Sequence, residues 1–277
     1  MEGYGFVQQE YLTNTYWDRL YARIAQFGAA ERIAAFELHG NNYSMYDGLY
    51  AMNPETFYEQ MTTMMTSQYH FVTIHELQGF LEGWLDLPKR SIILTTDSGG
   101  GSKLSFESIT AQFMQLEREF GYKPHMQSYI WTMGMRDDPS ADCDDKACWG
   151  FFLQAKESGF FTFGTHSHYH LSLGAQTASF LRDDLRLSKQ IILRNTGLDV
   201  YGVSWPNESC SRELDILRDL GISFGFGGFS RSGTDLFVRK ADGTPSCLPR
   251  IFPPNPAGYS SRPAGLTLEQ ILASQEN

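Results

Sequence analysis

Side chains able to do acid–base or metal chemistry follow directly after short apolar runs of this sequence. Asp97 follows SIILTT, and His166 and His170 belong to THSHYH after FFTFG. Two imidazoles four residues apart project from the same side if the chain begins a helical turn there, so they can hold one metal ion. An aspartate nearby can take a proton from water that such a metal activates. These residue types predict a metal-assisted hydrolytic site.

Both groups also have a structural interpretation. A cluster of three histidines can form an ordinary polar loop, and Asp97, followed by Ser98 and three glycines, can cap the next helix or fix the turn. Position favours the chemical interpretation, because in a closed parallel barrel the C-terminal ends of all strands lie on one face. Residues distant in sequence then converge on one pocket.

The apolar runs alternate with helix-like segments, which is the pattern of a parallel sheet in an α/β protein. One helix is expected over 178–197, ending at Gly197, and another over 211–221, ending at Gly221. Strands are expected at 33–38, 91–96, 126–131, 160–165, 200–205, 222–227 and 247–252.

The chain of 277 residues is expected to form one barrel domain over 33–277, preceded by a helical extension over 1–32. The extension is predicted because residues 8–30 place apolar side chains at helical spacing. Residues 253–263, rich in Pro, Gly and Ser, predict an extended surface segment.

Composition narrows the class of partner. Hydrophobic residues make up 42% of the chain, including 20 Phe, 14 Tyr and 5 Trp, which is enough for a large core. The net charge of −10 argues against nucleic acid or an anionic membrane surface, since both require clustered Lys and Arg. The chain contains no run of 18 apolar residues, so no transmembrane helix is predicted. Its start lacks the layout of a signal peptide.

Four cysteines leave the redox state open. Cys143 and Cys148 flank an acidic stretch, CDDKAC, that can close a disulfide if the chain is exported and holds free thiols otherwise. The remaining cysteines are Cys210 and Cys247, and no Cys-x-x-Cys pair predicts a zinc finger.

Several motifs together resemble the polysaccharide deacetylases with a NodB homology domain, the carbohydrate esterase family 4 type. They are SIILTTDSG, GFFTFGTHSHYHLSL, WPN, LGISFGFGG and LPRI, and they follow the family's order from about residue 33 to 252. The resemblance implies the family's fold, a distorted (β/α)7 barrel.

The resemblance also implies roles for the first residues considered. Asp97 matches the family's catalytic base, and His166 and His170 match two ligands of a divalent metal, which we expect to be Zn²⁺. Ser98 stands where the family has a metal-binding Asp. A neutral hydroxyl is a poorer ligand than a carboxylate, so we expect weakened metal binding or another ligand.

His39 follows the first expected strand. It resembles the Tyr-His element of permuted family members, including poly-N-acetylglucosamine deacetylases, in which this His protonates the leaving amine. Here Leu38 replaces the Tyr. His39 can alternatively hydrogen-bond a neighbouring loop.

The WPN element resembles the family's Arg-x-Pro-Tyr motif without its Arg, so Trp205, Pro206 and Asn207 are expected to form one wall of a substrate groove. Trp205 can equally be an ordinary core residue. Arg250, in LPRI, resembles a position that orients the Asp97 carboxylate, with a surface ion pair as the alternative.

The sequence therefore predicts a metal-dependent hydrolase that removes N-acetyl groups from an N-acetylglucosamine-type glycan. The expected products are acetate and an amino sugar. No Gly-x-Ser-x-Gly elbow supports a serine esterase. Two alternatives remain: a catalytically impaired domain that binds acetylated glycan, motivated by Ser98, and a deacylase of small amides. An extracellular, periplasmic or cell-surface location is expected, with the cytoplasm left open.

Overall fold

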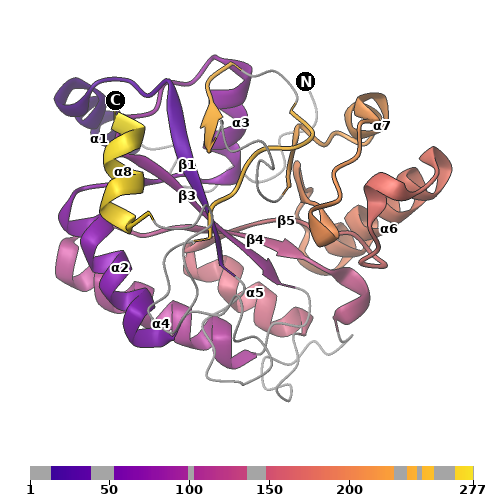
Figure 1. Cartoon of the computed structure of the whole chain (residues 1–277). Helices are drawn as coiled ribbons and strands as arrows, with labels where there is room; N and C mark the ends of the chain where they lie inside the picture. Colours follow the sequence, from indigo (N-terminus) through magenta and orange to yellow (C-terminus); the bar gives the residue numbers. More distant parts are fainter. Residues whose placement is uncertain are drawn as a thin grey trace.

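The computed structural model describes residues 14–38, 53–98, 103–135, 148–227, 236–241, 245–252 and 266–276. A sheet of short strands forms its centre, and helices surround that sheet (Figure 1). The strands are β1 (Arg32–Leu38), β2 (His70–Phe71), β3 (Ser91–Ser98), β4 (Met126–Ile130), β5 (Phe161–Thr165), β6 (Gly202–Ser204), β7 (Phe224–Phe226) and β8 (Phe237–Arg239).

The hydrogen-bonded order of the sheet is β7-β6-β5-β4-β3-β1-β8, and β2 pairs with β3. The pairings among β1 to β7 are parallel, and β8 pairs with β1 in the antiparallel direction. A parallel arrangement places the ends of β3 and β5 on the same edge, as the sequence pattern predicts.

The segment over 245–252 connects the two sides of the sheet. Leu248 donates its backbone N–H to Gly225 on β7 (2.7 Å), and Ile251 donates its own to Ala35 on β1 (2.7 Å). Parallel bridges join Leu248 to Phe226 and Ile251 to Phe36. The sheet is therefore curled into a distorted barrel, and Arg250 lies on the connecting segment.

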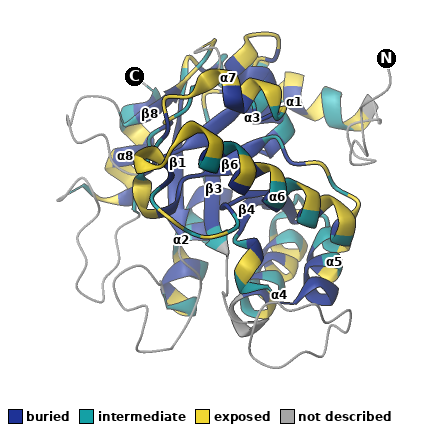
Figure 2. Cartoon of the chain, turned by 90° about the vertical axis from the view of Figure 1, so that its right-hand side faces the viewer, coloured by how far each residue is buried: buried dark blue, intermediate teal, exposed yellow. Residues whose placement is uncertain are grey.

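The helices cover the outside of this sheet, and their inner faces are buried (Figure 2). Every residue of β4 and β5 is buried, because both faces of these strands meet other side chains. The helices are α1 (Asn14–Phe27), α2 (Pro54–Thr66), α3 (Ile74–Glu82), α4 (Lys103–Phe120), α5 (Trp149–Ser158), α6 (Ala178–Thr196), α7 (Leu214–Asp219) and α8 (Leu268–Glu276).

Aromatic side chains fill the space between helices and sheet. Phe106 on α4 contacts Phe152 on α5 and Phe161 on β5, with ring centroids 5.2 and 5.4 Å apart. Phe113, about two turns further along α4, contacts Phe160, with ring centroids 5.6 Å apart. Aromatic pairs at these separations add to the stabilisation from burial, so α4 and α5 are fixed against the strand that precedes the histidines.

Local signals set the limits of the helices. Helix α6 begins after Thr177, whose hydroxyl accepts from the Phe180 N–H, and ends at Gly197 with φ +70°, as predicted. Helix α7 is shorter than the predicted 211–221. The Ser211 hydroxyl accepts from the Glu213 N–H before the helix begins, so Ser211 does not form the helix start that the sequence suggested.

Helix α1 confirms an amphipathic helix before the first strand, with Leu20 buried and Tyr21 exposed. Figure 1 shows it near the beginning of β1, away from the arrowheads of the strands. The domain division at residue 32 stays a prediction, and residues 253–263 lie outside the described part. In that part, no helix is long and apolar enough to cross a membrane.

Candidate active site

A buried cluster of three charged side chains lies where β1, β3 and the connecting segment meet. The Arg250 guanidinium donates to both oxygens of Asp97, with Nη1–Oδ1 at 2.8 Å and Nη2–Oδ2 at 3.0 Å. Its Nη2 also lies 3.0 Å from Oε1 of Glu37. The Arg250 side chain is 1% exposed and that of Asp97 is 3% exposed. This is an internal bidentate pair, so the surface alternative for Arg250 is wrong.

Burial alone would lower the pKa of Arg250, but the neighbouring carboxylates of Asp97 and Glu37 raise it above its ordinary value. The guanidinium stays charged and holds the Asp97 carboxylate in a defined orientation. Arg250 also donates from Nε to the Gly227 carbonyl at 3.0 Å, which fixes the other side of its planar group.

A disulfide packs behind Arg250. Cys210 and Cys247 are bonded, with Cα atoms 5.6 Å apart. A Cβ added to Gly227 would lie 2.6 Å from Sγ of Cys247. Only glycine therefore lets the backbone at residue 227, whose carbonyl accepts from Arg250, pack against the disulfide. Cys148 is disulfide-bonded as well, whereas Cys143 lies outside the described residues. The sequence did not indicate the pairing of Cys210 with Cys247.

His166 lies near Asp97, directly after β5, which β4 separates from β3 in the sheet. Its Nδ1 is 4.0 Å from Oδ2 of Asp97 and 2.8 Å from the carbonyl oxygen of Ser204, to which it donates. This hydrogen bond assigns the proton to Nδ1 and leaves Nε2 as the ring nitrogen with a free lone pair. The expected convergence of residues 97 and 166 on one face is therefore confirmed.

Burial lowers the pKa of His166 to about 4, against the opposing attraction of Asp97. The imidazole is consequently neutral near pH 7, the protonation state that a metal ligand requires. His170 lies against it, with ring centroids 4.8 Å apart, and the Trp131 ring lies 5.1 Å from His170 on the other side.

The chain from His166 to His170 does not form the helical turn that the spacing predicted. Ser167 has φ +68° and His170 has φ +56°, so the backbone twice enters the left-handed region. The Ser167 hydroxyl accepts from the His170 N–H at 3.0 Å, and this local bond stabilises the turn. The two imidazoles are nevertheless brought together, by a bend in place of a helix.

Asp184 of α6 stabilises this bend. Its two oxygens accept from the backbone N–H groups of His168 and Tyr169, each at 2.9 Å. The Asp184 side chain is buried, so these bonds compensate for removing its charge from water. The helical pattern of α6 marked Leu181 and Leu185 as inward residues, and Asp184 lies between them on the same buried face. Nothing in the motif itself pointed to this residue.

The described donors account for part of a metal site. His166 and His170 supply two imidazoles, yet no group of three or more His, Cys, Asp or Glu in the described ranges could hold a metal ion. Asp97 is close, but Arg250 engages both of its oxygens. The predicted acid His39 lies outside the described residues, and so does the side chain of Ser98. Among the described residues, His166 and His170 are the imidazoles that would hold a metal ion.

The predicted groove wall is corrected in part. Trp205 is 0% exposed, and its indole N–H donates to the Ser246 carbonyl. Pro206 is buried too, so neither ring offers a face to a sugar, and the core interpretation of Trp205 holds. Trp205 is buried because Gly225 leaves room for its indole between β6, β7 and the connecting segment. Asn207 is exposed, with φ +54°, and donates to the Ser172 hydroxyl at 3.3 Å.

Aromatic surface does occur beside the histidines. Trp131 is partly exposed and donates from its indole N–H to the His168 carbonyl at 2.9 Å, which fixes the ring. Met133 and Tyr169, 52% and 42% exposed, follow β4 and β5 respectively. Trp131, Met133 and Tyr169 therefore form a candidate apolar rim after β4 and β5, which the motifs of the sequence did not indicate.

Compared by sequence, the chain matches no family model and no curated protein. Solved structures do match. A polysaccharide deacetylase from Bacillus cereus aligns with a TM-score of 0.68 and 15% identity, over 90% of this chain and 70% of that one. IcaB from Ammonifex degensii aligns with a TM-score of 0.64 and 16% identity, over 89% and 98%.

A de-N-acetylase from Aggregatibacter actinomycetemcomitans aligns with a TM-score of 0.58 and 12% identity, over 79% of this chain and 94% of that one. The chain therefore has the fold of the polysaccharide deacetylases. Its form is the distorted NodB-type barrel that the sequence resemblance implied.

Proposed function

We propose that this protein is a metal-dependent carbohydrate N-deacetylase that acts on an N-acetylglucosamine-type glycan. The observation that carries the proposal is the meeting of Asp97, His166 and His170 at the strand ends of a polysaccharide deacetylase fold. A carboxylate beside two imidazoles, one of them kept neutral by burial, is the donor set needed for hydrolysis of an amide by activated water.

In the proposed reaction, Asp97 takes a proton from the attacking water. Arg250 donates to both Asp97 oxygens, so this charge-assisted pair favours the ionised base and fixes its orientation. His39 donates a proton to the departing nitrogen, and acetate and a free amine leave.

His166 and His170 would hold the metal, with Zn²⁺ the preferred ion for two imidazole ligands. When bound, the metal would polarise the acetyl carbonyl and lower the pKa of water. The Ser204 carbonyl aligns His166, and the bend held by Asp184 aligns His170. Because Ser98 provides no carboxylate, we expect a metal that exchanges readily.

The glycan would lie across the rim beside the histidines. Trp131 offers a fixed, partly exposed ring next to His170, and an aromatic face suits the apolar side of a sugar ring. It takes the stacking role that the sequence assigned to Trp205. Asn207, exposed near Ser172, remains a candidate hydrogen-bonding residue.

The disulfides support a location outside the reducing cytosol. Cys210, Cys247 and Cys148 are all bonded, and structural disulfides persist in oxidising compartments. An extracellular, periplasmic or cell-surface site of action agrees with a polysaccharide substrate.

Acetate release from N-acetylglucosamine oligomers tests the proposal, measured on metal-stripped protein before and after Zn²⁺ addition. We expect slow release that rises with metal. Asp97→Asn should reduce it by at least about 100-fold and keep glycan affinity within a few-fold, because the base acts in the transition state. Trp131→Ala should weaken glycan binding, with the exposed Trp84→Ala as the matched control.

Ser98 favours one other function, a glycan-binding domain without efficient catalysis. Such a protein would release no acetate from several N-acetylated glycans with any added divalent metal, and it would still lose affinity in Trp131→Ala. Release of acyl groups from small amides but not from oligomers would instead show a small-amide deacylase. The first result overturns the proposed catalysis, and the second overturns the proposed substrate.

A further inference from the structure

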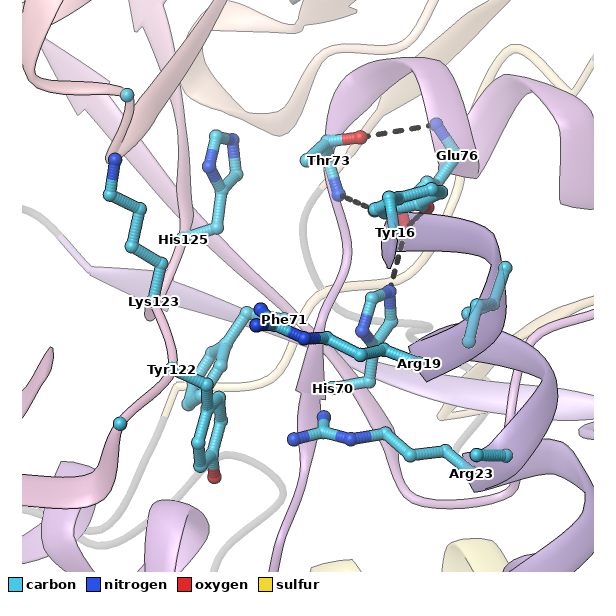
Figure 3. A pocket seen from close by; sticks show the side chains of 14 residues that line it. Tyr16, Arg19, Arg23, His70, Phe71, Thr73, Glu76, Tyr122, Lys123 and His125 are labelled. Carbon is cyan, nitrogen blue, oxygen red and sulfur yellow. Dashed lines mark hydrogen bonds and ion pairs between the residues drawn. The ribbon is translucent and has the colours of Figure 1, made fainter. Parts of the chain in front are cut away.

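A cavity of about 430 Å³ lies under α1, at the end of the barrel opposite the candidate active site. Its walls come from α1, from the start of β2 at His70, and from Lys123 and His125, which precede β4 (Figure 3). Asp97 is at the other end of β3. Since β3 rises roughly 3.3 Å per residue, about 20 Å separate the two sites. The cavity volume falls within the range of small-molecule sites.

Cationic side chains gather in this cavity, although the chain as a whole carries a net charge of −10. Arg19 and Arg23 are one turn apart on α1, and Figure 3 shows both reaching across the pocket toward Phe71 and Tyr122. Lys123 lies on the side of Tyr122. Like charges four residues apart destabilise a helix unless something compensates for them.

In the described part of the chain, neither arginine of the pair has an acidic partner. Among the described residues, no carboxylate forms an ion pair with Arg19 or Arg23, whereas Arg182 pairs with Asp219 and Arg218 pairs with Asp215. Arg23 donates to the Tyr69 carbonyl at 3.4 Å and lies 4.5 Å above the Tyr122 ring. Burial lowers the pKa of Arg23 and the charge of Arg19 acts in the same direction, whereas Tyr122 and Glu76 partly oppose this shift.

Glu76, the carboxylate in the lining of the cavity, forms hydrogen bonds with groups other than the two arginines. Oε1 of Glu76 accepts from His70 Nε2 at 2.7 Å and from the Tyr16 hydroxyl, and Oε2 accepts from the Thr73 N–H at 2.8 Å. Burial lowers the pKa of His125 to about 4, so its ring is neutral near pH 7. The Glu76 oxygens therefore bind His70, Tyr16 and Thr73, and the guanidinium groups of Arg19 and Arg23 form no hydrogen bond with them.

We infer that this cavity binds a small molecule through a phosphate or carboxylate group, held by Arg19 and Arg23. Guanidinium groups form paired hydrogen bonds with both kinds of oxyanion. Phe71 and Tyr122 would contact the remainder of the ligand. The site is independent of deacetylation and ties α1 to the barrel when it is filled.

Calorimetric titration of the purified protein with pyrophosphate and with citrate, in low-salt chloride buffer, tests the inference and separates the two oxyanions. We expect saturable binding of at least one, weakened 10-fold or more in Arg19→Gln and in Arg23→Gln. Arg194→Gln, an equal loss of charge on the exposed face of α6, should bind within twofold of the unaltered protein.

Melting temperature should rise with the bound oxyanion in the unaltered protein and in Arg194→Gln only. If neither oxyanion shows saturable binding up to about 10 mM, the inference is overturned, because a dissociation constant above that concentration corresponds to very weak binding. It is equally overturned by binding that both cavity variants retain. Arg19 is exposed, so Arg19→Gln tests the site without disturbing the core. Acetate release is measured in parallel and should not change, which separates this result from failure of the proposed catalysis.

Discussion

Arg250 shows how one residue can align a base and carry part of the fold. Its guanidinium joins Asp97 on β3, Glu37 on β1 and the Gly227 carbonyl, so three separate parts of the barrel meet at one charged group. Two carboxylates left together without it would be buried and uncompensated.

Replacing Arg250 by Met should lower the free energy of unfolding by about 3–5 kcal/mol, because the charges of Asp97 and Glu37 lose their partner. Urea denaturation near pH 7 measures this. Arg182→Met, which breaks an exposed pair with Asp219, is the control and should cost less than about 1 kcal/mol. An equal small effect of both variants would contradict the interpretation.

Ser98 is a second single residue whose replacement should change the site. We expect Ser98→Asp to retain Zn²⁺ more tightly than the unaltered protein, since a carboxylate adds charge compensation and a third ligand. Zinc calorimetry compares it with Ser179→Asp, which adds the same charge at an exposed position of α6. Equal or weaker zinc binding in Ser98→Asp would place residue 98 outside the coordination shell.

At the scale of elements, the bend after β5 depends on α6. Asp184 reaches up from the buried face of that helix and accepts two backbone N–H groups, while Thr165 Oγ1 accepts a third from Ser167 at 3.1 Å. These bonds compensate for the left-handed conformations of Ser167 and His170.

Asp184→Asn should weaken zinc binding about 10-fold and lower stability by about 1.5–3 kcal/mol, because an amide nitrogen would face one of the two N–H donors. Asp183→Asn, on the exposed face of the same helix, is the control. Zinc titration and urea denaturation of both proteins make the comparison. Unchanged zinc affinity in Asp184→Asn would mean that the bend forms without its support.

At the scale of the whole molecule, closure of the barrel depends on the segment over 245–252. Backbone bonds attach it to β7 and β1, and the Cys210–Cys247 disulfide attaches it to the chain after β6. The disulfide spans a sequence separation of 37 residues. Loss of such a cross-link increases the conformational freedom of the unfolded chain.

The double variant Cys210→Ser, Cys247→Ser should therefore be less stable by about 3–4 kcal/mol. Thermal and urea unfolding under non-reducing conditions measure the difference, and the disulfide at Cys148 remains in both proteins as an internal reference. A melting temperature equal to that of the unaltered protein would show that the backbone bonds suffice to close the barrel.

The sequence by itself determined the features that depend on local pattern. Alternating apolar runs and helical segments predicted the parallel barrel, and Gly197 correctly ended its longest described helix. The order of motifs around Asp97, His166 and His170 predicted that these residues would lie together, because parallel strands end on one face. The strands β2 and β8, of two and three residues, were not predicted from the sequence.

Only the tertiary structure decided the rest. Whether Trp205 is exposed depends on the room left by Gly225, and the pairing of Cys210 with Cys247 depends on where the connecting segment passes. The bend at the histidines depends on Asp184, whose contribution comes from a different helix. In each case the deciding contact joins residues far apart in the chain, and residue spacing reports local conformation but not which distant side chain fills a given space.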